Sequence, residues 1–249
     1  MSIMDELREQ CPWDKKQTIE SLRPMTIEET YELGDAVLKA DWKLIREELG
    51  DLLLHVLFYA RIAREEKQFT LEDVLRGISE KLITRHPHIY GDVKVKDEED
   101  VKRNWEKIKM KEGKDSILSG VPRGLPSLVK ATRIQEKVKQ VGFEWEHREQ
   151  VFEKIQEELL ELQEAVRKDD ANAVEEELGD VLFSVVNYAR FLNKDADSAL
   201  ERTNAKFMHR FQSLEKLVHA RGRDLKQMTL TEMDEVWNEI KQKNREENL

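Results

Sequence analysis

Two stretches of the chain carry the same pattern: "EELGDLLLHVLFYAR" at residues 47–61 and "EELGDVLFSVVNYAR" at residues 176–190. Each begins with acidic residues and continues into a long apolar run. The apolar residues recur at i, i+3, i+4, i+7 and i+8, which is one face of an α-helix with 3.6 residues per turn. Each stretch therefore predicts an amphipathic helix with acids at the edge of its apolar stripe. The stripes are Leu49, Leu52, Leu53, Val56, Leu57 and Ala60, and Leu178, Val181, Leu182, Val185, Val186 and Ala189.

The similarity extends along most of the chain in the same order. A second acidic helix precedes each stretch, near 25–39 and 154–168, and further pairs of predicted helices follow. They cover 71–85 and 196–219, which carry Lys and Arg, and 98–111 and 230–245, which carry Trp. Self-similarity that keeps its order predicts repeated structural units.

The repeat predicts two tandem domains, 1–118 and 119–249. They meet in "GKDSILSGVPRGLPS", where Gly and Pro interrupt the helical periodicity. About four helices per copy with short connections favour an all-α fold of two helical bundles.

The composition excludes several classes of protein. With 10 Gly and 5 Pro among 249 residues, the chain has little material for an all-β fold. The single cysteine, Cys11, leaves no internal disulfide framework and fits a reducing compartment, which predicts the cytoplasm. We expect neither a secretory signal nor a membrane span. The net charge of −10 disfavours duplex DNA as a partner.

The acids recur in a spacing that suits a metal ion. Within each helix the acids are three residues apart and so share one face. If the two acidic helices of a copy are antiparallel neighbours, four carboxylates converge, and hard oxygen ligands suit Mg²⁺ or Mn²⁺. The sets are Glu29, Glu32, Glu48 and Asp51 in the first copy, and Glu158, Glu161, Glu177 and Asp180 in the second.

The motifs "EETYE…EELGD", "CPWD" and "RHPH", with Lys, Arg and Trp further along, resemble those of the MazG family of nucleoside triphosphate pyrophosphohydrolases. The resemblance covers nearly the whole chain, including the duplication. It implies the all-α pyrophosphohydrolase fold, a homodimer, and Mg²⁺-dependent cleavage of a nucleoside triphosphate to the monophosphate and pyrophosphate. The chain departs from the family pattern at His209, where a second Arg often stands, and at Ala173, where a Lys can occur.

The resemblance also assigns roles to residues. In the second copy the four acids would be catalytic metal ligands, and the first copy would hold metal with its own four. The nucleotide contacts would be Glu157, Glu176, Lys206, Arg210 and Trp237, and in the first copy Lys81, Arg85 and Trp105. Trp237 could stack on any base, which predicts broad base tolerance.

The two copies differ beside their acids. In the second copy Ile155, Leu159, Leu162 and Val166 form an uninterrupted apolar stripe, whereas threonines interrupt the first. We therefore expect the second copy to be the main catalytic site. The first copy has an additional stripe, which we expect to serve assembly: Ile27, Tyr31, Gly34 and Leu38.

Two other functions stay open at this point. A ferritin-like di-iron bundle also uses inward carboxylates, but it favours Glu-x-x-His pairs. A non-catalytic helical module that binds nucleotides or other partners would release no pyrophosphate. His86 and His88 of "RHPHIY" could bind metal, but a capping or turn role fits better because Pro87 interrupts the helix.

Overall fold

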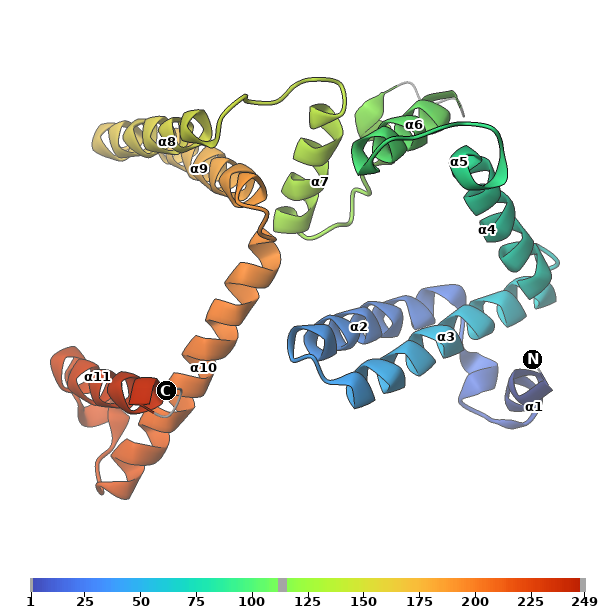
Figure 1. Ribbon diagram of the computed structural model, residues 1–249. Coiled ribbons are helices and arrows are strands. Elements are labelled where there is room, and N and C mark those ends of the chain that lie inside the picture. The colour runs from blue at the N-terminus through green and yellow to red at the C-terminus, as the bar shows by residue number, and fades with distance from the viewer. Residues whose placement is uncertain (1, 112–115, 247–249) are drawn as a thin grey trace. The chain divides into compact units, whose positions relative to one another are not determined.

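The computed structural model describes residues 2–111 and 116–246; the side chains of residues 99, 102, 106, 107, 109–111 and 244–246 lie outside the description. Every regular element in these ranges is a helix, which confirms the predicted all-α class (Figure 1). The chain divides into two compact units, Met1–Ser116 and Ile117–Leu249. No helix in the described part is both long and apolar enough to cross a membrane.

The first unit is built on a pair of long helices that lie side by side (Figure 1). Thr18 begins one of them with a capping box, and the Asp41 carboxylate accepts hydrogen bonds from two backbone N–H groups at the start of the other. Met4, Phe58 and Ile62 help to pack the first helix against this pair. The helices are α1 (Ser2–Gln10), α2 (Ile19–Leu38), α3 (Trp42–Glu65), α4 (Leu71–Arg85), α5 (Pro87–Tyr90) and α6 (Glu98–Lys111).

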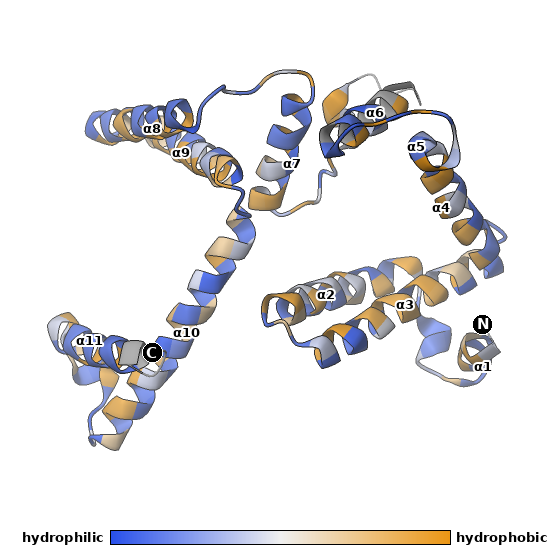
Figure 2. Cartoon of the chain, in the orientation of Figure 1, coloured by the Kyte–Doolittle hydropathy of each residue, from blue (hydrophilic) through white to orange (hydrophobic). Residues whose placement is uncertain are grey.

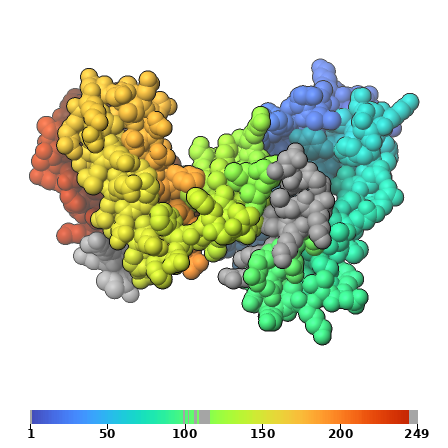
Figure 3. All heavy atoms as spheres, turned by 90° about the horizontal axis from the view of Figure 1, so that it is seen from above, coloured from blue at the N-terminus to red at the C-terminus, as the bar shows by residue number. Residues whose placement is uncertain are grey.

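The second unit repeats the long pair as α8 and α9, which pack closely along their length (Figure 3, yellow and orange). Asp169, with φ of 55°, ends α8, and Asp170 caps α9 as Asp41 caps α3. The helices are α7 (Ser127–Lys139), α8 (Arg148–Lys168), α9 (Ala171–Phe191), α10 (Ala196–Ala220) and α11 (Leu230–Glu246).

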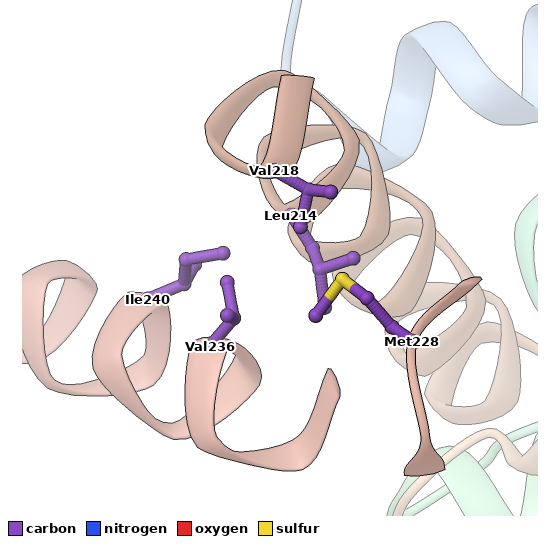
Figure 4. Packing of buried hydrophobic residues seen from close by; sticks show 5 residues of the cluster. All are labelled: Leu214, Val218, Met228, Val236 and Ile240. Carbon is purple, nitrogen blue, oxygen red and sulfur yellow. The ribbon is translucent and has the colours of Figure 1, made fainter. Parts of the chain in front are cut away.

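A separate apolar core joins α10 and α11. In Figure 4 the side chains of Leu214 and Val218 from α10 point toward those of Val236 and Ile240 from α11, and Met228 closes one side. All five are buried. This core fixes α11 on α10 independently of the α8–α9 pair.

The predicted apolar stripes are mostly not the buried faces of the long pairs, and this prediction is wrong in detail. Leu159 and Val166 are 41% and 58% exposed, whereas Val151, Glu158 and Ala165 are buried against α9. When two helices pack as a pair, each covers only a narrow strip of the other. On α8 the covered strip contains the acid Glu158. Much of the stripes stays uncovered within each unit: Leu49, Leu53, Val56, Leu178, Leu182 and Val185 are exposed. Figure 2 shows the apolar residues along α2, α3 and α9.

Candidate functional site

The second unit brings three of its four predicted carboxylates together. Glu158 of α8 is buried, Glu161 lies one turn further along α8, and Glu177 comes from α9. One carboxylate oxygen of each lies within 4.8 Å of the others. The side-by-side packing of α8 and α9 creates this cluster, because residues three apart share a helix face. The fourth acid, Asp180, is exposed and lies on the wall of an adjacent cavity.

A lysine neutralises part of the charge of this cluster. Lys154 Nζ lies 2.7 Å from Glu158 Oε1 and 2.8 Å from Glu157 Oε1, and these hydrogen bonds raise the pKa of the lysine. The pKa of Glu161 is also raised, first by a hydrogen bond with Glu158, then by burial and by the charges of Glu158 and Glu177. Acids that raise one another's pKa favour a cation between them.

The first unit forms a matching cluster from Glu29 of α2 with Glu48 and Asp51 of α3, again with oxygens within 4.8 Å. Burial is the largest cause of the raised pKa of Glu29 and of Glu48, and the neighbouring acids add to it. Glu32 is exposed and lies outside the three-residue group, but its charge contributes to both shifts. The predicted convergence of acids therefore occurs in both units, with three members in each group.

The surroundings of the two clusters differ. The repeat puts Met25 at the place of Lys154. One turn from the first cluster, Thr26 Oγ1 lies 2.7 Å from His55 Nδ1 and 2.9 Å from the Tyr59 hydroxyl. This half-buried polar network, in which His55 is buried, links α2 to α3.

A cavity of about 480 Å³ opens beside the second cluster. Its lining includes Glu158, Lys154 and Asp180, together with the aromatic side chains of Phe143 and Trp145. Phe143 and Trp145 belong to the segment between α7 and α8 and are 80% and 45% exposed. The carboxylates thus adjoin a mostly apolar chamber large enough for part of a small molecule.

Two side chains that line this cavity have unmatched polar atoms. Gln135, only 3% exposed, donates from Nε2 to the Phe183 carbonyl oxygen at 2.9 Å, and its Oε1 has no hydrogen-bond partner. Arg190 donates from both Nη atoms, but its buried Nε has no partner. Buried polar groups in proteins are normally paired, so a water molecule or a polar ligand in the cavity could pair with this acceptor and this donor.

The predicted nucleotide contacts of the second unit lie on other elements. Lys206 is exposed and Arg210 half-buried on α10, and Trp237 packs on the α10–α11 core with its ring 5.1 Å from that of Phe207. None of the three lines the cavity. Glu157 pairs with Lys154 at the cluster; Glu176 is exposed on α9.

In the first unit, two of the three equivalent residues, Arg85 and Trp105, lie together. The Arg85 guanidinium lies 5.5 Å from the centroid of the Trp105 ring, while Lys81 is exposed on α4. His86 ends α4, with Nδ1 2.7 Å from the Leu82 carbonyl oxygen, and its ring lies 5.0 Å from Trp105. His86 therefore occupies a turn between helices, and it belongs to neither of the acid clusters.

Sequence reasoning missed the aromatic wall of the cavity. Phe143 and Trp145 flank Glu144 in "GFEWE", a short segment after α7, a helix that we did not predict. The sequence did contain a signal, which was two aromatic residues on either side of an acid in a loop between helices. Loops often carry binding residues, so exposed aromatic rings in a loop suggest a binding site. Lys154 was also missed, although it lies one turn before Glu158.

Known proteins match this chain closely in sequence. A family model described as "MazG nucleotide pyrophosphohydrolase domain" matches residues 17–90 and again 146–218. A protein of Thermotoga maritima named "Nucleoside triphosphate pyrophosphohydrolase/pyrophosphatase MazG" is 47% identical over 97% of this chain and 94% of its own length. The Escherichia coli K12 "Nucleoside triphosphate pyrophosphohydrolase" is 42% identical over 97% of this chain and 95% of its own.

A longer relative contains the same region as one part. "Uncharacterized protein YabN" of Bacillus subtilis is 46% identical over 98% of this chain, which spans 51% of that protein. Each of the two matches to the family model includes one long helix pair and the acid cluster on that pair. The chain therefore belongs to the MazG nucleotide pyrophosphohydrolase family, with two copies of the family's domain in tandem.

Proposed function

We propose that the chain hydrolyses nucleoside triphosphates to the monophosphate and pyrophosphate in a Mg²⁺-dependent reaction, with the main site in the second unit. The observation that carries the proposal is the Glu158–Glu161–Glu177 cluster beside an apolar cavity. The family and the names of its near full-length relatives support the reaction class.

The three carboxylates fit a hard divalent ion in chemistry and spacing. Mg²⁺ bound there would neutralise charge on the triphosphate oxygens and on the departing pyrophosphate. Lys154 is placed to donate to the same phosphate oxygens, since its ammonium already contacts the cluster. Asp180, at the cavity wall and outside the three-oxygen group, is the carboxylate available to orient the attacking water.

The cavity would take the base. Its aromatic and aliphatic walls offer stacking, which favours every base by roughly 1–3 kcal/mol and so predicts broad tolerance. Trp237 remains a predicted second stacking surface, and Lys206 and Arg210 remain predicted phosphate contacts. The described acid clusters contain no histidine, which disfavours the di-iron alternative.

We also propose that the chain works as a homodimer in a reducing compartment such as the cytoplasm. Ile27 and Tyr31 are 42% and 59% exposed within the first unit, so their predicted burial requires a surface outside that unit. The uncovered stripes of the long helices would likewise be covered by a second subunit, because exposed apolar faces of this extent mark interaction surfaces. The half-buried Cys11 is a free thiol.

A panel of nucleoside triphosphates with Mg²⁺ tests the activity, with monophosphate, diphosphate, pyrophosphate and orthophosphate measured separately. Monophosphate and pyrophosphate in equal amounts support the proposal. Diphosphate with orthophosphate from a phosphatase-free sample would contradict the α–β cleavage. No product from any nucleotide would favour the non-catalytic helical module.

A further inference from the structure

An ion pair ties the aromatic segment beside the cavity to α9. Arg190 Nη1 and Nη2 donate to the two carboxylate oxygens of Glu144 at 2.6 and 2.7 Å. Both side chains are largely buried, with 14% and 18% exposure, so water screens this pair less than a surface pair. A bidentate arginine–carboxylate contact fixes both distance and plane.

Described hydrogen bonds hold the rest of the segment at its two ends. At the start, the Phe143 backbone N–H donates to the Val138 carbonyl oxygen, and Gly142 has φ of 85°. At the end, the backbone N–H groups of Glu146 and His147 donate to Gln150 Oε1 at the start of α8. Between these anchors, Glu144 supplies the described side-chain bond from the segment to α9.

The position of this bond matters for the cavity. Glu144 lies directly between Phe143 and Trp145, and all three line the cavity together with Arg190. Neighbouring side chains on one short segment move together, so the ion pair sets where both rings lie relative to α9. Arg190 Nη2 also donates to Asn187 Oδ1 at 2.6 Å, which orients a second polar side chain of the lining.

The first unit uses the equivalent arginine differently. Arg61 pairs with Asp5 of α1 and with Glu65 of its own helix. Arg61 therefore attaches α1 to the α2–α3 pair, and α1 contains no aromatic residue. The duplicated chain thus supplies an internal control, with the same arginine at the same place of the repeat.

We propose that Arg190 and Glu144 are positioning residues that hold Phe143 and Trp145 in place as the binding surface for the nucleobase. The pair thereby determines which nucleotides the second unit accepts. This proposal rests on the proposed function, because it assigns the base to the cavity beside the carboxylates. The unmatched Gln135 Oε1 and Arg190 Nε fit a ligand with both a donor and an acceptor, such as the edge of a base.

The experiment compares Glu144→Gln, Arg190→Gln and the double variant with the wild type. For nucleoside triphosphates with Mg²⁺ we expect KM to rise about tenfold in each single variant while kcat changes little, because the acids and the phosphates stay in place. The double variant should be no worse than either single variant, since two residues that act through one bond are not additive. The order of preference among nucleotides should also change.

Inorganic tripolyphosphate, which has the phosphates but no base, separates positioning from general damage. Its inhibition constant should be unchanged in every variant. A parallel rise of KM and of this constant would overturn the proposal, and so would an unchanged KM. Asp5→Asn, which breaks the equivalent pair in the first unit, should leave KM unchanged; a rise as large as that of Glu144→Gln would also contradict the proposal.

Failure of the proposed function has a different signature. If the wild type hydrolyses no nucleotide, the same variants are compared by calorimetric binding of a non-hydrolysable triphosphate analogue and of tripolyphosphate. A selective loss of analogue binding of about tenfold supports the positioning role even then. Equal binding of the analogue by variants and wild type, including no binding by any of them, overturns it.

Discussion

Lys154 Nζ lies 2.7 Å from Glu158 Oε1, so a lysine ammonium occupies one side of the carboxylate group that we assign to Mg²⁺. Lys154→Met, which installs the residue found at the equivalent Met25, should therefore strengthen Mg²⁺ binding in the absence of nucleotide by severalfold, since a competing cation is removed. Calorimetric titration measures this directly. Lys168→Met is the control, because Lys168 pairs with Glu164 outside the cluster. Weaker Mg²⁺ binding by Lys154→Met would show that the lysine supports the metal site.

Glu177→Gln should abolish most turnover and leave the fold intact. The amide keeps the size of the side chain but removes one charge from the three-carboxylate group, and a loss of roughly 100-fold or more is expected for a metal ligand. Steady-state turnover and helical circular dichroism are measured together. Glu175→Gln, on the exposed side of the same helix, is the matched control. Full activity at saturating Mg²⁺ would remove Glu177 from the site.

Matched substitutions in the two units should have unequal effects. Glu161→Gln should reduce turnover far more than Glu32→Gln, because Glu161 belongs to its three-carboxylate group, whereas Glu32 lies outside the corresponding group. Both variants are assayed across a Mg²⁺ titration. Equal losses, or a larger loss for Glu32→Gln, would make the first unit a catalytic site in its own right.

The start of α11 should give the protein a pH-dependent contribution to stability. Backbone and side-chain hydrogen bonds from Thr229 and the ion pair with Arg223 lower the pKa of Glu232 from 4.5 to about 2. A lowered pKa in the folded state stabilises the fold above pH 4.5, and this contribution is lost as the pH falls toward 2. Glu232→Gln should therefore melt below the wild type at neutral pH.

The difference between the two melting temperatures should shrink as the pH is lowered through that window. Glu235→Gln on the same helix provides a control, because Glu235 is exposed on α11. A constant difference down to the acid limit would assign the effect to helix capping geometry rather than to the charge.

The exposed apolar face of α2 should govern assembly. Light scattering at micromolar concentration should give the mass of a dimer, and Ile27→Glu should shift it toward the monomer, since burial of one such side chain contributes roughly 1.5–3 kcal/mol. Ile3→Glu, at an exposed position of α1, should leave the mass unchanged. A wild type that is monomeric at this concentration would contradict the homodimer.

Most of the helices could be predicted from the sequence, because the apolar periodicity of a helix is a local pattern. The predicted range 71–85 coincides with α4, and 98–111 with α6, while α1 and α7 were not predicted. The convergence of acids also followed from local spacing plus the assumption of antiparallel neighbours. What could not be predicted was which face of each pair is covered, because an apolar stripe does not state whether its partner belongs to the same unit. Glu158 is buried and Leu159 exposed for this reason.

The cavity escaped prediction for a different reason. Its walls come from α7, α8, α9 and an irregular segment, and the contact that joins them, Arg190 to Glu144, links residues 46 apart in the chain. A periodic sequence pattern does not predict an ion pair between residues so far apart in the chain. Arginine ends "YAR" in both copies, yet the structure gives Arg61 and Arg190 different partners.

That divergence of partners has a consequence for the history of the chain. After a duplication, an arginine inherited by both copies can acquire a different partner in each: Asp5 of α1 for Arg61, and Glu144 of a connecting segment for Arg190. The acids that we assign to Mg²⁺ lie on α8 and α9, outside the α7–α8 connection, so under the proposed positioning role mutations in that connection would alter nucleotide preference while these acids stay in place. Under this proposal, the connection between α7 and α8 is the part of the chain in which substitutions would change substrate choice, in evolution or in laboratory selection, without changing the acids.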